Sequence, residues 1–136
     1  MTFEIVNPKS LSAPKGWNHG LLAPPGGRVL FVAGQAGWET GAPGTPPGFV
    51  EQFDLALDKV LTVVREAGGA ATDVGRMTIF VTDLAAYTAG RKAIGAAWRA
   101  RMGKHYPAVA LLEVKSLVDE GALVEIEATA VIGGNR

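Results

Sequence analysis

Apolar side chains fill both faces of an expected strand at residues 28–36. Val29 and Phe31 point to one face, and Leu30 and Val32 point to the other. Strands with two apolar faces occur inside a fold, where helices or another chain cover each face. We therefore expect this strand to be central and covered on both sides.

The expected strand ends in a glycine-rich turn. Gly34, Gln35 and Gly37 interrupt the apolar pattern. Glycines at a strand end let another backbone or a ligand come close, and the Gln35 amide offers both donors and an acceptor. A tight turn with an exposed glutamine explains the same residues without any function. The residues alone leave both interpretations open.

Two stretches have the helical period. In residues 49–67 the apolar stripe consists of Phe49, Phe53, Ala56, Leu57, Val60, Val63, Val64 and Ala67, with Gln52, Asp54, Asp58, Lys59, Arg65 and Glu66 elsewhere. Asp83 is expected to cap a second helix over residues 84–102, which Gly103 ends. The buried side of that helix is expected to carry Tyr87, Ile94, Ala97, Trp98 and Met102.

Alternating or apolar runs predict the remaining strands, at residues 3–6, 19–23, 76–82, 108–114 and 123–132. Residues 24–27 are expected to join the second strand to the third as a hairpin. Residues 38–48, rich in glycine and proline, form a long loop. The order is β-β-β-α-β-α-β-β, an α+β fold.

Right-handed crossovers would place both helices on one face of one mixed sheet. The other face, on which we expect Leu30 and Val32, then lacks a cover. A neighbouring subunit is expected to supply it, so the pattern predicts an oligomer.

Composition narrows the class of protein. The chain of 136 residues is expected to form a single domain, residues 1–136. Thirteen basic and thirteen acidic residues cancel, which argues against a nucleic-acid partner. The chain has no cysteine, so disulfides and thiolate chemistry are excluded. We expect no signal peptide, no membrane partner and a cytoplasmic location.

Three motifs together resemble the RidA/YjgF family, whose members are associated with hydrolysis of reactive enamines and imines. The motifs are Phe31-Val-Ala-Gly-Gln-Ala-Gly37, Asp73-Val-Gly-Arg-Met-Thr-Ile-Phe-Val-Thr-Asp83 and Val124-Glu-Ile-Glu-Ala-Thr-Ala130. They cover nearly the whole chain in the family's order. The resemblance implies a homotrimer of chorismate-mutase-like subunits with small-molecule clefts between them. We expect no metal and no cofactor.

The resemblance also implies roles for residues. Glu125 matches the family position that positions a hydrolytic water, and the backbone of Gly34 and Gln35 would bind the substrate. Glu125 and Glu127 share one strand face with Thr129. Such a strand face is more often simply solvated, which would explain the two glutamates without chemistry.

One family position departs from the pattern. Members that hydrolyse 2-imino acids carry an arginine after the Pro-Ala of the fifth strand, where a guanidinium binds the substrate carboxylate through two hydrogen bonds. Here the segment is Tyr106-Pro-Ala-Val-Ala110, so Val109 takes that place. Valine cannot bind a carboxylate. We therefore expect hydrolysis of ordinary 2-imino acids to be weak or absent.

Three further pocket positions differ from common family residues. Ala33 stands where many members have serine, and Arg91 where they commonly have asparagine. Trp17 lies near a position that is often tyrosine, so the ring remains and the hydroxyl is lost. Arg91 either replaces the missing charge or is simply solvated, and the sequence favours the solvated arginine.

Two functions remain open. In the first, the protein deaminates an imine or enamine that lacks the usual carboxylate. In the second, it is a non-catalytic trimer that binds a small molecule. A chorismate-mutase-type isomerase would need several cations at matching positions, and a ribonuclease fits poorly with zero net charge. His19 and His105 are expected to be ordinary hydrogen-bonded histidines rather than metal ligands.

Overall fold

The structure is a computed structural model that describes residues 3–133 of the chain. Its elements are β1 (Glu4–Val6), β2 (Gly20–Leu22), β3 (Arg28–Ala36), α1 (Phe49–Glu66), the 3-10 turn η1 (Ala71–Asp73), β4 (Val74–Val81), α2 (Leu84–Ala89), α3 (Arg91–Met102), β5 (Ala108–Glu113) and β6 (Val124–Ile132). The predicted order and the α+β class are confirmed. The second predicted helix is broken at Gly90, whose ψ of 6° ends α2 before α3 begins.

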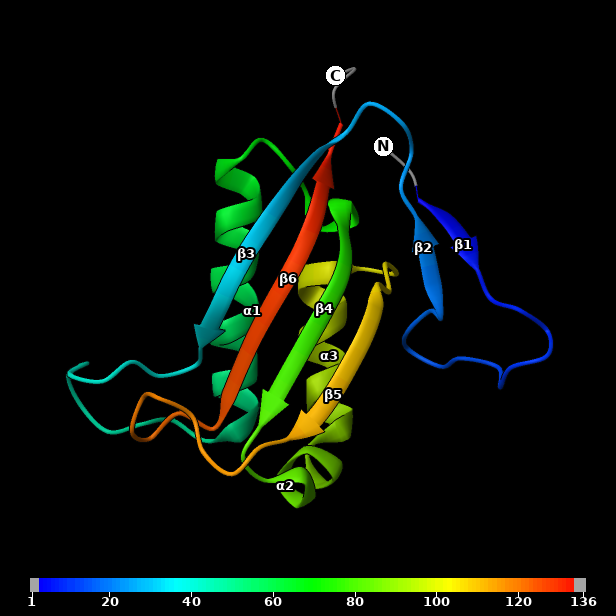
Figure 1. Ribbon diagram of the computed structural model, residues 1–136. Helices are drawn as coiled ribbons and strands as arrows, with labels where there is room; N and C mark the ends of the chain where they lie inside the picture. The colour runs from blue at the N-terminus through cyan, green and yellow to red at the C-terminus, as the bar shows by residue number, and fades with distance from the viewer. Residues whose placement is uncertain (1–2, 134–136) are drawn as a thin grey trace.

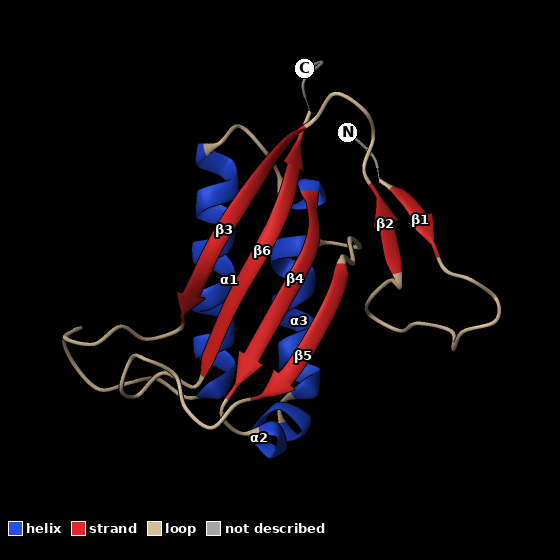
Figure 2. Ribbon diagram, viewed as in Figure 1, coloured by secondary structure: helices blue, strands red, loops and turns tan. Residues whose placement is uncertain are grey.

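A four-stranded mixed sheet forms the centre of the molecule. The strand order is β3-β6-β4-β5, with β4 and β5 parallel and the other pairs antiparallel. Helices α1 and α3 pack side by side against one face of this sheet, as Figure 1 and Figure 2 show. No described element covers the other face.

The core lies between the sheet and the two helices. On β4 the inward residues are Met77, Ile79 and Val81, as the alternating pattern predicts. Asp83 caps α2, because its Oδ1 accepts a hydrogen bond of 3.1 Å from the backbone N–H of Ala86. From the helices Phe53, Ala56, Leu57, Val60, Leu61, Val64, Ile94, Trp98 and Met102 complete the core.

The expected burial of α1 needs two corrections. Leu61 is buried although the predicted stripe omits it, and Gln52 is fully buried although it was placed on the polar side. The Gln52 amide is buried because it bridges two loops. Its Nε2 donates to the carbonyls of Pro47 (3.0 Å) and Gly121 (2.9 Å), and its Oε1 accepts from the backbone N–H of Leu123 (2.8 Å).

The faces of β3 are the reverse of the expectation. Val32 is buried and Leu30 packs partly buried against the same core, so these two side chains face the helices. Val29 and Phe31 point to the uncovered face and are 57% and 80% exposed. An apolar patch therefore does lie on the open face, but it is made of Val29 and Phe31.

The predicted hairpin between the second and third strands does not form. The prediction of one mixed sheet is also wrong. β2 pairs with β1 in a separate two-stranded sheet (Figure 1). Asn18, just before β2, donates from its backbone N–H to Pro107 O (3.2 Å) and from Nδ2 to Tyr106 O (2.6 Å). These bonds hold the segment beside β5, at the sheet edge opposite β3. Within the described residues β3 therefore pairs only with β6.

Candidate functional site

The pairing of β3 with β6 shifts register between Val32 and Gln35. The two residues in the shift are Ala33 and Gly34, and both are exposed. Such a bulge locally disrupts the ladder and re-aims the side chains beside it, and bulges are common next to functional sites. The second half of the predicted motif is thus an irregular strand end.

Gly34 lies directly against the carboxylate of Glu125 across the bulge. A Cβ added at Gly34 would lie 2.8 Å from Glu125 Oε2 and 3.0 Å from its Cδ. Any side chain at position 34 would displace that carboxylate. The glycine is therefore required for the position that Glu125 takes on β6.

The other residues of the motif make contacts at the same end of β3. Gln35 donates from Nε2 to the carbonyl of Ala33, 3.2 Å away. Gly37 meets the backbone of Gln52 on α1 so closely that a Cβ there would collide with it. The prediction that these glycines admit a close neighbour is confirmed, and for Gly37 the neighbour is a helix backbone.

The loops at this end of the sheet are tied together. Lys59 on α1 donates from Nζ to the carbonyl of Ala36 (2.6 Å). Asp119 accepts at Oδ1 from both the backbone N–H and the hydroxyl of Thr40, each at 2.9 Å. These hydrogen bonds lower the pKa of the Asp119 carboxyl below its ordinary value. The loops at 37–48 and 115–122 therefore form one connected frame beside the bulge.

Glu125 and Glu127 both point to the open face of the sheet, as their alternation predicts. Between them Ile126 is fully buried against the helices. Glu125 is half-buried beside the bulge, whereas Glu127 is exposed. The two carboxylates therefore have different surroundings, which the sequence alone does not distinguish.

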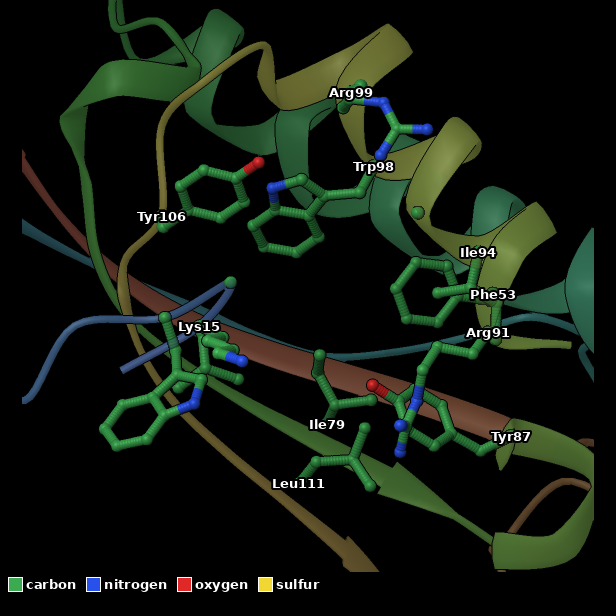
Figure 3. A pocket seen from close by; sticks show the side chains of 14 residues that line it. Lys15, Phe53, Ile79, Tyr87, Arg91, Ile94, Trp98, Arg99, Tyr106 and Leu111 are labelled. Carbon is green, nitrogen blue, oxygen red and sulfur yellow. The ribbon is translucent and has the colours of Figure 1, made fainter. Parts of the chain in front are cut away.

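A cavity of about 710 Å³ lies on the other side of the sheet, between α3 and strands β4 and β5. Figure 3 shows its aromatic and aliphatic walls. The apolar lining consists of Trp17, Phe53, Ile79, Tyr87, Ile94, Trp98, Tyr106, Val109 and Leu111. This volume suits a small organic molecule.

Two contacts fix the aromatic wall. The rings of Trp98 and Tyr106 are nearly parallel, with an interplanar angle of 5° and centroids 6.3 Å apart. Trp98 also donates from Nε1 to the carbonyl of His105 (3.2 Å). Trp17 reaches the cavity because Asn18, the next residue, is bonded to the start of β5.

The charged lining residues are all basic. They are Lys15, Arg91 and Arg99, and none of the described lining residues is acidic. The guanidinium of Arg91 lies 5.7 Å from the centroid of the Tyr87 ring, a cation–π contact. None of the described ion pairs involves these three side chains.

The structure separates the predicted site residues into two groups. Trp17, Arg91 and Val109 line the cavity on the helix-covered side. Ala33, Gly34, Gln35 and Glu125 gather at the bulge on β3 and β6. Strand β4 lies between β6 and β5. Within one subunit these groups do not form a common site.

Sequence reasoning missed several cavity residues. Tyr106 begins the segment that contains Val109 but was given no role, and Tyr87 and Trp98 were assigned only to a buried helix face. Their aromatic character gave a signal, but an aromatic residue on a helix face ordinarily indicates core packing. Arg99 and Lys15 gave no signal, because nothing in the sequence separates them from other exposed cations.

Both histidines make hydrogen bonds to carbonyl oxygens, as predicted. His19 Nε2 lies 2.7 Å from Ser12 O, and His105 Nε2 lies 2.7 Å from Val74 O. A carbonyl only accepts, so Nε2 carries the proton in both rings. Among residues 3–133, no cluster of three or more potential metal ligands occurs. No helix in this range has the length and hydropathy of a transmembrane span.

Comparison with known proteins adds a sequence relationship to this geometry. The family model described as endoribonuclease L-PSP matches residues 8–132. A protein named 2-iminobutanoate/2-iminopropanoate deaminase from Capra hircus is 29% identical over 107 residues, covering 78% of this chain and 74% of that protein. A RutC family protein from Haemophilus influenzae is 29% identical over 105 residues, covering 77% and 80%.

Solved structures share the fold. A Rid-family protein of unknown function from Yersinia pestis superposes with a TM-score of 0.80 at 28% identity, covering 97% of this chain and all of that chain. The YjgF gene product of E. coli gives a TM-score of 0.63 at 26% identity, covering 94% and 98%.

Proposed function

The chain belongs to the RidA/YjgF family, also described as endoribonuclease L-PSP, and on that premise we propose that it hydrolyses reactive imines or enamines. The observation that carries the proposal is the contact between Gly34 and the Glu125 carboxylate at the β3 bulge. Ordinary 2-imino acids are expected to be weak substrates or none, because Val109 stands where the family's arginine would bind a carboxylate next to the C=N bond.

The reaction needs one water and one group that moves protons. Water adds to the carbon of the C=N bond, and the Glu125 carboxylate accepts its proton. The same carboxyl then returns the proton to nitrogen. The carboxylate next takes the hydroxyl proton of the carbinolamine and passes it to nitrogen as the C–N bond breaks, so that ammonia leaves and the carbon becomes a carbonyl. An enamine first takes a proton at carbon to become the imine.

Assembly is part of the proposal. The bulge and the cavity are two different patches of the chain, so joining them requires a heterologous contact between neighbouring subunits. Heterologous contacts form a ring when the rotation between subunits closes, and the family resemblance gives the number three. The exposed side chains of Val29 and Phe31 support burial of the open face in such a ring. A cytoplasmic location is also proposed, and cell fractionation would test it.

The test generates imines in situ with an amine or amino-acid oxidase and follows the release of the carbonyl product. We expect acceleration by the wild-type protein on imines without an adjacent carboxylate. Glu125→Gln should abolish it, whereas Glu127→Gln, two residues along the same strand face, should retain it. No acceleration with any imine, or equal losses in both variants, would contradict the proposal.

A non-catalytic binding role has one observation in its favour, the combination of Val109 with a preserved cavity. In that case the protein binds ligands but does not turn them over, so neither Glu125→Gln nor Glu127→Gln changes a rate. The imine assay combined with a binding measurement distinguishes the two functions.

A further inference from the structure

We infer that the cavity binds molecules with an aromatic body and a carboxylate, and that Arg91 and Arg99 hold the carboxylate at the mouth. The inference rests on the proposed function only in using the cavity as half of the substrate cleft. Val109 supplies no cation for a carboxylate, and the inference assigns that role to arginines on helix α3. It also places the acid group away from the reacting C=N bond.

The shape and lining of the cavity determine the body of the ligand. Trp98 and Tyr106 present parallel rings on one wall, and Tyr87 adds aromatic surface elsewhere (Figure 3). Trp17 also lines the cavity. Aromatic rings bury large apolar areas and favour stacked or edge contacts with other rings. A small acid such as a three-carbon or four-carbon keto acid would leave most of the 710 Å³ unfilled.

The charge of the lining determines the head of the ligand. Arg91, Arg99 and Lys15 contribute three positive charges, and the described lining residues contribute no negative charge. Cations without neighbouring carboxylates attract anions, and a guanidinium binds a carboxylate through paired hydrogen bonds. The Tyr87 ring under Arg91 limits the freedom of that side chain.

Gly95 lies midway between Arg91 and Arg99 on α3, so the two arginines stand about two helical turns apart along one side of the helix. It lines the cavity itself, and a Cβ there would lie 3.2 Å from Arg99 Nη1. Glycine inside a helix is less favourable than alanine, so it brings no advantage to the helix. It leaves the cavity wall between Arg91 and Arg99 without a side chain, so a ligand can lie against the helix there.

The test measures binding of a matched pair, 3-phenylpropionate and its neutral amide, by calorimetry and by quenching of Trp17 and Trp98 fluorescence. We expect the acid to bind at least tenfold more tightly, with an affinity that falls as salt is added. Arg91→Gln and Arg99→Gln should each weaken the acid roughly tenfold and leave the amide unchanged. Lys92→Gln, which removes the neighbouring charge outside the lining, should change neither.

Gly95→Leu supplies a variant whose effect cannot be confused with unfolding. Leucine favours helix and fills the space between the arginines, so thermal stability should be kept or raised while binding of the acid is lost. Equal affinities for acid and amide, or an equal loss in Lys92→Gln, would overturn the inference. Acid binding that survives both arginine substitutions would also overturn it.

The outcome is separable from that of the imine assay. Acid binding without hydrolysis of any imine rejects the proposed function and keeps the inference. Hydrolysis of imines without selective binding of the acid rejects the inference and keeps the proposed function.

Discussion

Gly34 on β3 and Glu125 on β6 are packed so closely that residue 34 must be glycine for the carboxylate to hold its position. A Cβ at residue 34 would lie 2.8 Å from Glu125 Oε2. The bulge in β3 and the half-buried glutamate on β6 are therefore one structural unit. The first prediction tests that unit directly.

Gly34→Ala should lower the rate of imine hydrolysis about tenfold or more, because the new methyl group displaces the carboxylate that orients the water. Stability should change by less than about 1 kcal/mol, since the carboxylate can move toward solvent. Gly48→Ala is the control, because a Cβ there meets no atom within 4 Å. Kinetics and urea unfolding on both variants check the prediction, and an unaltered rate in Gly34→Ala would refute it.

Phe31→Glu should convert the proposed trimer into monomers. The side chain is 80% exposed in the subunit and lies on the open face of the sheet, where a charge would oppose burial against a neighbour. Val118→Glu is the matched control, because Val118 is 98% exposed but lies in a loop. Light scattering measures the molar mass, and so the number of subunits, of both variants. A wild-type monomer at micromolar concentration would contradict the predicted assembly.

Val109→Arg should introduce hydrolysis of 2-imino acids. A guanidinium–carboxylate pair in a water-poor cleft contributes roughly 1.5–3 kcal/mol, which corresponds to about one to two decades in kcat/KM. The gain should vanish in the double variant with Glu125→Gln, and Val118→Arg should give none. Because the new charge would join Arg91 and Arg99 in the cavity, circular dichroism must first show that the variant folds. A folded variant without activity would show that a cation at position 109 is insufficient.

Gln52→Leu should destabilise the protein by about 2–4 kcal/mol. The substitution leaves the carbonyls of Pro47 and Gly121 and the N–H of Leu123 without their buried partner. Loop 37–48 should also become more sensitive to limited proteolysis. Glu51→Leu, at the exposed neighbouring position, should change stability by less than about 0.5 kcal/mol. Equal urea midpoints for the two variants would exclude the proposed role of Gln52.

The ion pair between Asp54 on α1 and Arg101 on α3 should make the free energy of unfolding depend on pH. Arg101 bonds Asp54 through two hydrogen bonds, 2.6 Å from Nε to Oδ1 and 3.0 Å from Nη2 to Oδ2. Hydrogen bonding to Arg101 lowers the pKa of Asp54 below its ordinary value of 3.8. Because the folded pKa is depressed, the stabilisation is complete above pH 3.8 and is lost as pH falls through the folded value.

Asp54→Asn should therefore reduce the free energy of unfolding by about 1 kcal/mol at pH 7, a modest value because both side chains are partly solvated. The difference from wild type should shrink toward zero near pH 2. Glu66→Gln, at an exposed position on the same helix, serves as the control. Urea unfolding at both pH values measures the effect, and a difference that persists in acid would disprove it.

The sequence by itself determined the elements and their chemistry, because those depend on local periodicity. The 3.6-residue stripe defined α1, the alternation of Met77, Ile79 and Val81 defined β4, and the Asp83 cap began α2. The three linked motifs indicated the family, and the family model matches residues 8–132. Gly34 and Glu125 were identified from those motifs and Val109 from the separate segment Tyr106–Ala110, although their functional roles remain proposals.

Tertiary structure decided everything that depends on contacts distant along the chain. Alternation shows that Val29 and Phe31 share a face, but only docking of α1 decides which face becomes solvent-exposed. The bonds from Asn18 to the start of β5 decide that β2 leaves β3, and no local pattern encodes them. Likewise Arg99 and Gly95 join Val109 in one cavity only because α3 packs over β5, which brings together residues that helical periodicity alone leaves unrelated.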